Sequence, residues 1–447
     1  MPAIIYDKPD PPNNLQAGYS MPRDQRRLAS PWTRRYGDGA VEGAGVLAKS
    51  LPIFSSRADF RFPAPNSNAL PPQQGRQGVA YVTASGNFHR QVVRGRPAMI
   101  QELGSAKIRH LKVERWKRHR YRDRSVLFLL PPPAIGEHVA IRLFLEVFMA
   151  RAQPREVALL GSDAATDVYA GMPGLAVYPA WMAHDELKRF NAVVDLNDVP
   201  ARREIEFWPV DMEAALYDLF GLPAPDPIEE AAVRSTGEPI RVGILPLASS
   251  PMRTLPLELV LGLNDALRGD GMDVRVVLNP QQNQSALLRA ALDAASDNLD
   301  YIEDTRSVAD LLRLMRQFDY AIFADSGPAH LSKLEQRPGA AIFTSAPSDL
   351  LLGRHRNLLP IQAQYDSDFC QAPCGLAKLR RMADGRVGCM ASLGVARDDL
   401  PRTVDGPDPD MVRRFLLEDP VPCVAAIASD AARIAVDIRA DLQRRHR

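Results

Sequence analysis

With 447 residues, the chain exceeds the usual size of one hydrophobic core, so we expect two domains plus appendages. Lysine plus arginine (55) nearly cancel aspartate plus glutamate (54), so the overall charge favours no nucleic acid, membrane or acidic partner. The N-terminus lacks the pattern of a signal peptide, and no apolar run is long enough to span a bilayer. We therefore expect a cytoplasmic protein.

The first 124 residues show little apolar periodicity. Residues 1–75 are rich in Pro, Gly, Ser, Asn and Arg, which predicts an irregular arm. Residues 76–124 predict a basic, weakly structured lead-in, with short strands near "VAYVTA" and "RQVV". Its last part, 107–124, holds nine Lys or Arg against two acids and is interleaved with Trp116 and Tyr121.

This basic segment has two interpretations. It is either a solvated linker or a patch for anionic lipid, a lipid-linked phosphosugar or nucleic acid. No nucleic-acid-binding motif accompanies it. We therefore expect no nucleic acid partner, and of the binding interpretations we favour peripheral contact with the inner membrane.

The rest of the chain alternates strand-like and helix-like segments in two blocks. The first block is residues 125–221, with strands expected at 125–130, 155–161 and 191–196 and a helix at 138–152. A segment rich in Pro, Gly and acid, 222–239, predicts a linker. The second block, 240–447, has strands expected at 240–247, 273–279, 320–325 and 339–344, alternating with helices at 255–267, 284–295, 307–318 and 328–336.

Short apolar strands that alternate with helices indicate parallel sheets covered on both faces. The expected architecture is a two-domain α/β enzyme with a cleft between the domains. In the helix at 307–318, the apolar side is expected to be formed by Val308, Leu311, Leu312 and Met315.

The stretch "FADSGPAHLSK", 323–333, predicts a buried strand that turns sharply into a helix. Ligands of open parallel sheets bind at this place, outside the carboxyl ends of the strands. Gly327 permits a tight turn, and Pro328 suits the first turn of a helix. Free N–H groups at Gly327, Ala329 and His330, together with the helix dipole, would suit a phosphate. The same turn also serves as a plain strand-to-helix connector.

Residues 301–343 resemble glycosyltransferase family 9, the ADP-heptose:lipopolysaccharide heptosyltransferase family, whose members have a GT-B fold of two Rossmann-like domains facing a cleft. Three other segments are similar: "SVLFLLPPPAIGEHVAIRLFLEVF", "RVGILPLASSPMRTLP" and "CQAPCGLAKLRRMADGRVGCM". The resemblance covers roughly residues 125–440. It implies that the donor site includes Ser249, Ser250, Arg253, Asp325, Ser326, Gly327, Pro328, Ala329 and His330.

The resemblance implies an inverting glycosyltransferase that moves a heptose-like sugar from an ADP-heptose-like donor, without a catalytic metal, to a glycan, lipid-linked or protein hydroxyl. Glu137, in "IGEH", stands where the family presents an acidic catalytic base. The alternative for Glu137 is a first-turn residue that serves the helix dipole, with His138 exposed.

A second function is a non-catalytic GT-B protein that binds or scaffolds a partner. Three changed family positions favour it: Glu137 replaces the Asp of I-G-D, Gln336 stands where a Gly is expected, and Thr344 and Ser345 replace Gly-Pro. The long N-terminal arm, which could dock a partner, also favours it. The segment "NPQQNQS" lacks the acid that contacts the ribose in the family, which leaves the donor open.

The four cysteines are too few for a disulfide framework in a chain of this length. Four thiolates would suit a tetrahedral structural zinc or iron. The segment also resembles the iron site of bacterial autotransporter heptosyltransferases, which implies the ligands Cys370, Cys374, Cys389 and Cys423. The alternative is that the cysteines are buried thiols, with Cys423 part of the core.

Overall fold

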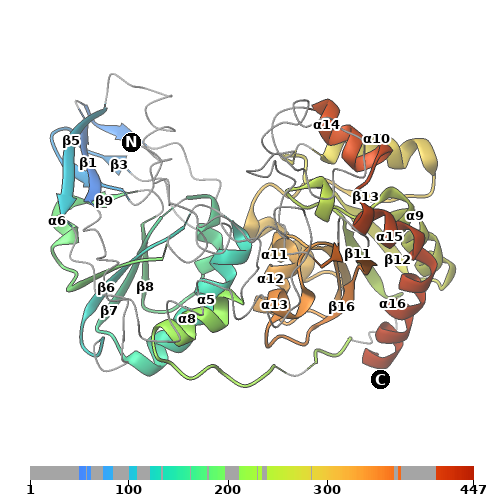
Figure 1. The fold of residues 1–447 in the computed structure, drawn as a ribbon. Coiled ribbons are helices and arrows are strands. Elements are labelled where there is room, and N and C mark those ends of the chain that lie inside the picture. Colours follow the sequence, from blue (N-terminus) through green and yellow to red (C-terminus); the bar gives the residue numbers. More distant parts are fainter. Residues whose placement is uncertain are drawn as a thin grey trace.

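The structure is a computed structural model of the chain. It describes residues 50–56, 58–61, 74–83, 100–107, 121–131, 134–161, 163–178, 181–196, 211–228, 230–233, 239–282, 284–366, 371–373 and 409–446. Two α/β domains lie side by side, and the extended segment around 222–233 runs from one to the other (Figure 1). Within the described residues, no helix is both long enough and apolar enough to cross a membrane.

The first domain is built on a parallel sheet in the order β10-β6-β7-β8. Its strands are β6 (Ser125–Leu129), β7 (Glu156–Leu160), β8 (Leu175–Tyr178) and β10 (Ala192–Asp195). Helix α5 (Ile135–Ala152) connects β6 to β7, and α8 (Met212–Leu219) packs on α5. Aromatic rings fill the space under α5, with the Phe144 and Phe220 centroids 4.6 Å apart. The expected strands and helix of this block are confirmed.

A small antiparallel sheet, β5-β1-β4-β9, packs beside the first domain. It comprises β1 (Ser50–Ser56), β4 (Ala80–Val82), β5 (Ile100–Lys107) and β9 (Met182–Ala183), and a hairpin of β2 (Phe60–Arg61) and β3 (Gln74–Gly75) lies nearby. The prediction of an irregular arm to residue 75 is therefore wrong for 50–56, which pair with 100–107. The sequence of this strand, SLPIFSS, mixes Ser and Pro with three apolar residues in no regular alternation, so it carries little local strand signal. Residues 1–49, "RQVV" and most of the basic segment, 108–120, lie outside the described residues.

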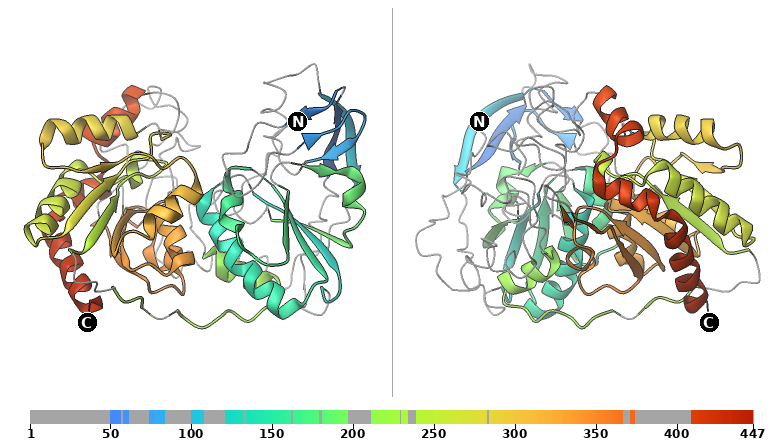
Figure 2. Two further views of the ribbon diagram at one scale, coloured as in Figure 1. Left: turned by 180° about the vertical axis from the view of Figure 1, so that it is seen from behind. Right: turned by 45° about the vertical axis from the view of Figure 1, so that its right-hand side comes forward.

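The second domain is built on a six-stranded parallel sheet in the order β13-β12-β11-β14-β15-β16. The strands are β11 (Arg241–Leu245), β12 (Asp273–Val277), β13 (Tyr301–Ile302), β14 (Tyr320–Ala324), β15 (Gly339–Phe343) and β16 (Leu358–Gln362). Every residue of β14 and β15 is buried, because helices cover both faces of the sheet (Figure 2). A two-stranded ribbon of β17 (Tyr365–Asp366) and β18 (Gln371–Ala372) follows.

The helices of the second domain form two layers (Figure 2). The outer layer contains α9 (Leu257–Gly269), α10 (Ser285–Ala295), α15 (Pro422–Ser429) and α16 (Ala431–Arg445), with α14 (Pro409–Arg413) and a π-helical turn (Arg414–Glu418) at one end. The inner layer faces the first domain and contains α11 (Val308–Met315), α12 (Gly327–Glu335) and α13 (Ser348–Leu352). On α11, Val308 and Met315 are buried as expected, but Leu314 replaces the half-buried Leu311 and Leu312.

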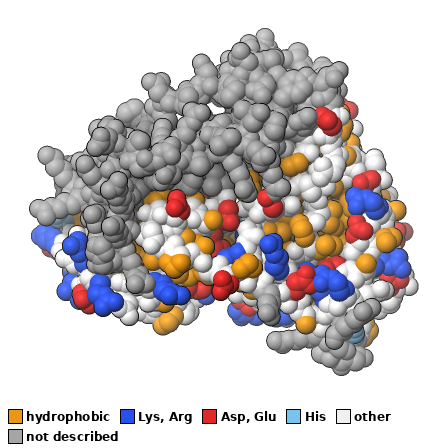
Figure 3. Space-filling view, turned by 60° about the horizontal axis from the view of Figure 1, so that its bottom comes forward, with side chains coloured by type: hydrophobic (Ala, Val, Ile, Leu, Met, Phe, Trp, Pro, Cys, Tyr) orange, Lys and Arg blue, Asp and Glu red, His pale blue; other side chains and the backbone are white. Residues whose placement is uncertain are grey.

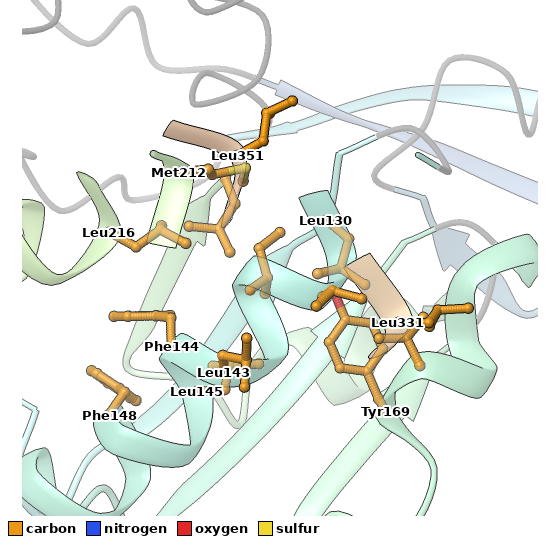
Figure 4. Packing of buried hydrophobic residues seen from close by; sticks show 14 of the residues in the cluster. Leu130, Leu143, Phe144, Leu145, Phe148, Tyr169, Met212, Leu216, Leu331 and Leu351 are labelled. Atoms are coloured by element: carbon orange, nitrogen blue, oxygen red, sulfur yellow. The ribbon is translucent and has the colours of Figure 1, made fainter. Parts of the chain in front are cut away.

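One hydrophobic core extends across both domains. Leu331 of α12 and Leu351 of α13 belong to the same buried cluster as Phe144, Tyr169 and Met212 of the first domain (Figure 4). A continuous apolar core means that the domains are held together by burial of apolar surface as well as by polar contacts. Away from this core, charged side chains of both signs are interspersed over the described part of the face in Figure 3.

A buried ionic cluster adds a polar contact between the domains. Glu213 of α8 accepts hydrogen bonds from Arg354 (2.7 Å) and Tyr217 (2.8 Å), and its other oxygen lies 2.8 Å from Nε2 of His355. Burial alone would raise the pKa of Glu213, but His355 and Arg354 outweigh it and lower the pKa to about 2. Burial lowers the pKa of His355 itself. The ionised Glu213 therefore stabilises the folded state at pH values above its lowered pKa.

Glu213→Gln is expected to lower the free energy of unfolding by about 3 kcal/mol at neutral pH, because Arg354 loses its buried counter-ion. The pKa of Glu213 is lower in the fold than its ordinary value of 4.5, so this stabilisation is complete above pH 4.5 and is lost toward pH 2. Chemical denaturation across this range should show the difference between variant and wild type shrinking as the pH falls. The matched control is Glu303→Gln, whose exposed pair with Arg289 should contribute less than about 1 kcal/mol. A difference that stays constant with pH would contradict this account.

Candidate active site

The N-termini of α5 and α12 meet at the carboxyl edge of the two sheets. A Cβ atom placed on Gly136 would lie 2.8 Å from Cδ2 of His330, and one placed on Gly327 would lie 3.0 Å from Cβ of Ile135. Both distances are shorter than side chains normally tolerate, so the two glycines permit this approach. The structure thereby brings the predicted turn at 325–330 directly against the first turn of α5, which carries Glu137.

The start of α12 differs from our expectation in its hydrogen bonding. The N–H groups of Ala329 and His330 both donate to the carbonyl oxygen of Ser326, at 3.1 and 3.4 Å. The prediction that these two N–H groups are free is wrong, because Ser326 is the N-cap residue and its carbonyl accepts the first bonds of the helix. Of the three groups, only the Gly327 N–H remains a candidate donor to a ligand.

Arg253 links the predicted loop and turn. It lies in a short 3-10 helix, η4 (Pro251–Arg253), between β11 and α9. Its guanidinium donates to the Asp325 carbonyl oxygen (3.2 Å) and to Ser249 Oγ (2.7 Å), and it lies 3.7 Å from the Asp325 carboxylate. The Asp325 side chain is only 2% exposed, so Arg253 neutralises a buried charge.

The two serines of this loop have different environments. Ser249 is exposed, whereas Ser250 is fully buried and its carbonyl accepts from the backbone and side chain of Thr254. In this conformation only Ser249 is placed to meet a ligand. Thr344, one of the residues that depart from the family pattern, donates to the Met252 carbonyl at 2.6 Å and so helps to hold η4.

Glu137 lies in the first turn of α5 and is 8% exposed. It directly follows Gly136, the residue in contact with His330. His138, which one interpretation left exposed, is fully buried, and its Nδ1 lies 2.8 Å from the Tyr169 hydroxyl. Burial raises the pKa of Tyr169 well above its ordinary value, so its hydroxyl stays neutral. Glu137 is therefore held by a helix whose first turn is anchored to the domain core.

A pocket of about 190 Å³ opens beside the contact between α5 and α12. It is walled by strand ends of the second domain, by the loop before α11 and by one residue from each of the two helix N-termini, Ile135 and Pro328. Its polar lining comes from side chains that we did not select from the sequence: Asn279, Gln281, Gln282, Thr305, Arg306 and Ser307. Asn279, Gln281 and Gln282 directly follow a buried strand, and this position is the signal that could have identified them as pocket residues.

Cys423 lies buried in α15, in the same core cluster as Ala372 of β18. α15 packs on β17, the partner strand of β18, and in the chain Cys370 and Cys374 flank the described residues 371–373. These two cysteines and Cys389 lie outside the described residues. Among the residues that are described, no group of three or more His, Cys, Asp or Glu could hold a metal. The ligand set would have to be completed by cysteines outside them.

Two Rossmann-like domains, each built on a parallel sheet and lying side by side, place the protein in the GT-B fold class. No protein-family model and no curated protein matches the sequence. The similar solved structures include members of glycosyltransferase family 9, the family that the sequence resembles.

Three solved structures illustrate this similarity. A glycosyltransferase family 9 protein from Veillonella parvula has a TM-score of 0.42 and 12% identity, over 54% of this chain and 86% of its own. The iron-containing dodecameric heptosyltransferase TibC, in complex with ADP-D-beta-D-heptose, has a TM-score of 0.46 and 12% identity, over 89% and 92%. TibC comes from enterotoxigenic E. coli. ADP-heptose LPS heptosyltransferase II of E. coli has a TM-score of 0.41 and 15% identity, over 56% and 93%. These identities are too low to carry over donor, acceptor or mechanism.

Arg253→Ala is expected to lower the free energy of unfolding by about 3 kcal/mol, because it leaves the Asp325 carboxylate buried without its counter-ion. Urea denaturation measures this difference. Arg275→Ala, which removes a half-exposed pair with Asp273 in the same domain, should change it by less than about 1 kcal/mol. Equal effects of the two substitutions would show that the Arg253 pair is not structurally important.

Proposed function

We propose that the protein is an inverting glycosyltransferase that moves a heptose-like sugar from a nucleotide diphosphate donor to a hydroxyl acceptor. The observation that supports this most is the 190 Å³ pocket, which lies beside the contact between the N-terminus of α5, which carries Glu137, and the 325–330 turn. Its apolar walls and few amide and hydroxyl groups suit a nucleoside. One lining residue, Pro328, lies in the first turn of α12, where the helix dipole and Arg253, bonded to the adjacent Asp325, would favour a diphosphate.

In the proposed reaction Glu137 takes the proton of the acceptor hydroxyl as that oxygen attacks the anomeric carbon. The bond from the anomeric carbon to the diphosphate breaks, and the nucleoside diphosphate leaves with the bonding electrons. The Gly327 N–H, the start of α12 and Arg253 would stabilise the charge that develops on the leaving group, so the proposed chemistry needs no metal.

An ADP-heptose-like nucleotide sugar is the first candidate donor. The acceptor would be a cell-surface glycan, a lipid-linked sugar or a protein hydroxyl. Peripheral contact of the basic segment with an anionic membrane would suit a lipid-linked acceptor.

A non-catalytic GT-B protein is the second candidate. It is favoured by the contact of Ile135 with Gly327, which covers part of the α12 N-terminus, and by the internal bonds of the Ala329 and His330 N–H groups. Under this proposal the fold would bind or scaffold a partner without transferring a sugar.

Glu137→Gln is expected to keep donor binding and to reduce turnover by about 10²–10⁴-fold, because an amide cannot accept the proton. Thermal shift with ADP-heptose and other nucleotide sugars measures binding, and release of the nucleoside diphosphate measures turnover. Glu146→Gln, on an exposed position of the same helix, is the matched control.

Turnover retained in the Glu137 variant would remove Glu137 from the mechanism. If no nucleotide or nucleotide sugar raises the melting temperature of the wild type, the non-catalytic candidate is the better one.

As a separate proposal, the cysteines hold a structural iron or zinc, supported by the packing of α15, which carries Cys423, on the ribbon that Cys370 and Cys374 flank. Elemental analysis of the purified protein should find about one metal ion per chain. Cys374→Ser should lose it, whereas Ser367→Ala in the same segment should not. Absence of metal from the wild type, or full retention in Cys374→Ser, would contradict this proposal.

A further inference from the structure

The wall of the pocket formed by α11 depends on how the first turn of that helix is held. Arg306, Ser307, Val308 and Leu311 line the pocket. Ser307 Oγ accepts the Asp310 N–H at 3.0 Å, and the Asp310 carboxylate accepts the Arg306 N–H at 3.3 Å. These local bonds close the turn on itself.

A further bond to this turn comes from the other domain. The Ala309 N–H donates to Oδ2 of Asp167 at 3.2 Å, across 142 positions of sequence. Asp167 belongs to η3 (Asp163–Tyr169) of the first domain and is only 2% exposed. A carboxylate at a helix N-terminus is stabilising, and burial strengthens its hydrogen bond. The first domain thus supplies a cap for a helix of the second.

η3 is in turn anchored to α5, the helix that carries Glu137. Arg142 of α5 donates to the carbonyl oxygens of Val168 (2.5 Å) and Ala170 (3.2 Å). His138, adjacent to Glu137, contacts the Tyr169 hydroxyl at 2.8 Å. A continuous series of contacts therefore connects the candidate base to the pocket wall.

We propose that Asp167 is a positioning residue that fixes the α11 wall of the donor pocket from the opposite domain, so that the pocket is complete only while the two domains are in contact. The pocket's role as a donor site rests on the proposed function. The cap itself rests on the observed bond between the domains. Asp167 acts through α11 and is not placed in contact with the reacting atoms.

The test compares Asp167→Ala with Asp167→Asn, because the Asn side chain keeps an oxygen that can accept the Ala309 N–H. Hydrogen exchange at Ala309 should be about tenfold faster or more in the Ala variant and close to wild type in the Asn variant. The KM for the donor should rise by a similar factor in the Ala variant while kcat changes less. Asp185→Ala, at an exposed position of the first domain, is the control.

Unchanged exchange at Ala309 and unchanged donor KM in Asp167→Ala would overturn the inference and leave the proposed function intact. If Asp167→Ala instead lowers the overall stability and speeds hydrogen exchange uniformly along the chain, the inference is also overturned, because Asp167 would then have only a structural role. If the Ala variant fails to fold, Asp167→Asn alone decides. A normal donor KM together with normal exchange at Ala309 in this variant supports the inference. An altered donor KM with normal exchange at Ala309 contradicts it. Failure of the wild type to bind any nucleotide sugar would instead refute the proposed function.

Discussion

The arrangement of the candidate site depends on the close approach of two helix N-termini. Gly136 and Gly327 leave room for His330 and Ile135, and without that room α5 and α12 would have to separate. The same contact sets Glu137 beside the 325–330 turn and lets Ile135 form one wall of the pocket. It also allows the apolar faces of α5, α12 and α13 to merge into one core. A single steric constraint thus couples the packing of the domains to the geometry of the pocket.

Two polar contacts act with this core, and both join residues more than a hundred positions apart. Glu213 joins α8 to the turn after α13, and Asp167 caps α11. Each places a carboxylate on one domain and its hydrogen-bond donor on the other. Because buried charges that lose their partners are costly, such contacts favour one relative orientation of the domains over others. Hydrophobic burial supplies attraction, and these carboxylates supply specificity of orientation.

The sequence was sufficient for elements with local signals. The uninterrupted apolar run of β14 and the Gly-Pro start of α12 predicted both correctly. It was insufficient where the determinant is non-local: the sheet that pairs 50–56 with 100–107, the burial of Ser250, and the polar contacts between the domains. Gln336 adopts φ 47° at the C-cap of α12, a conformation that favours glycine, which explains why a Gly is expected at this position; nothing in the structure explains the Gln.

The central claim is that the pocket beside the contact of α5 and α12 holds a nucleoside diphosphate. Calorimetric titration of the wild type and of Leu311→Trp, which fills the pocket, with ADP, UDP and GDP tests it most directly. The account predicts saturable binding of one diphosphate at one site per chain in the wild type and loss of that binding in the variant. Binding of none of the three by the wild type, or equal affinity in both proteins, would contradict it.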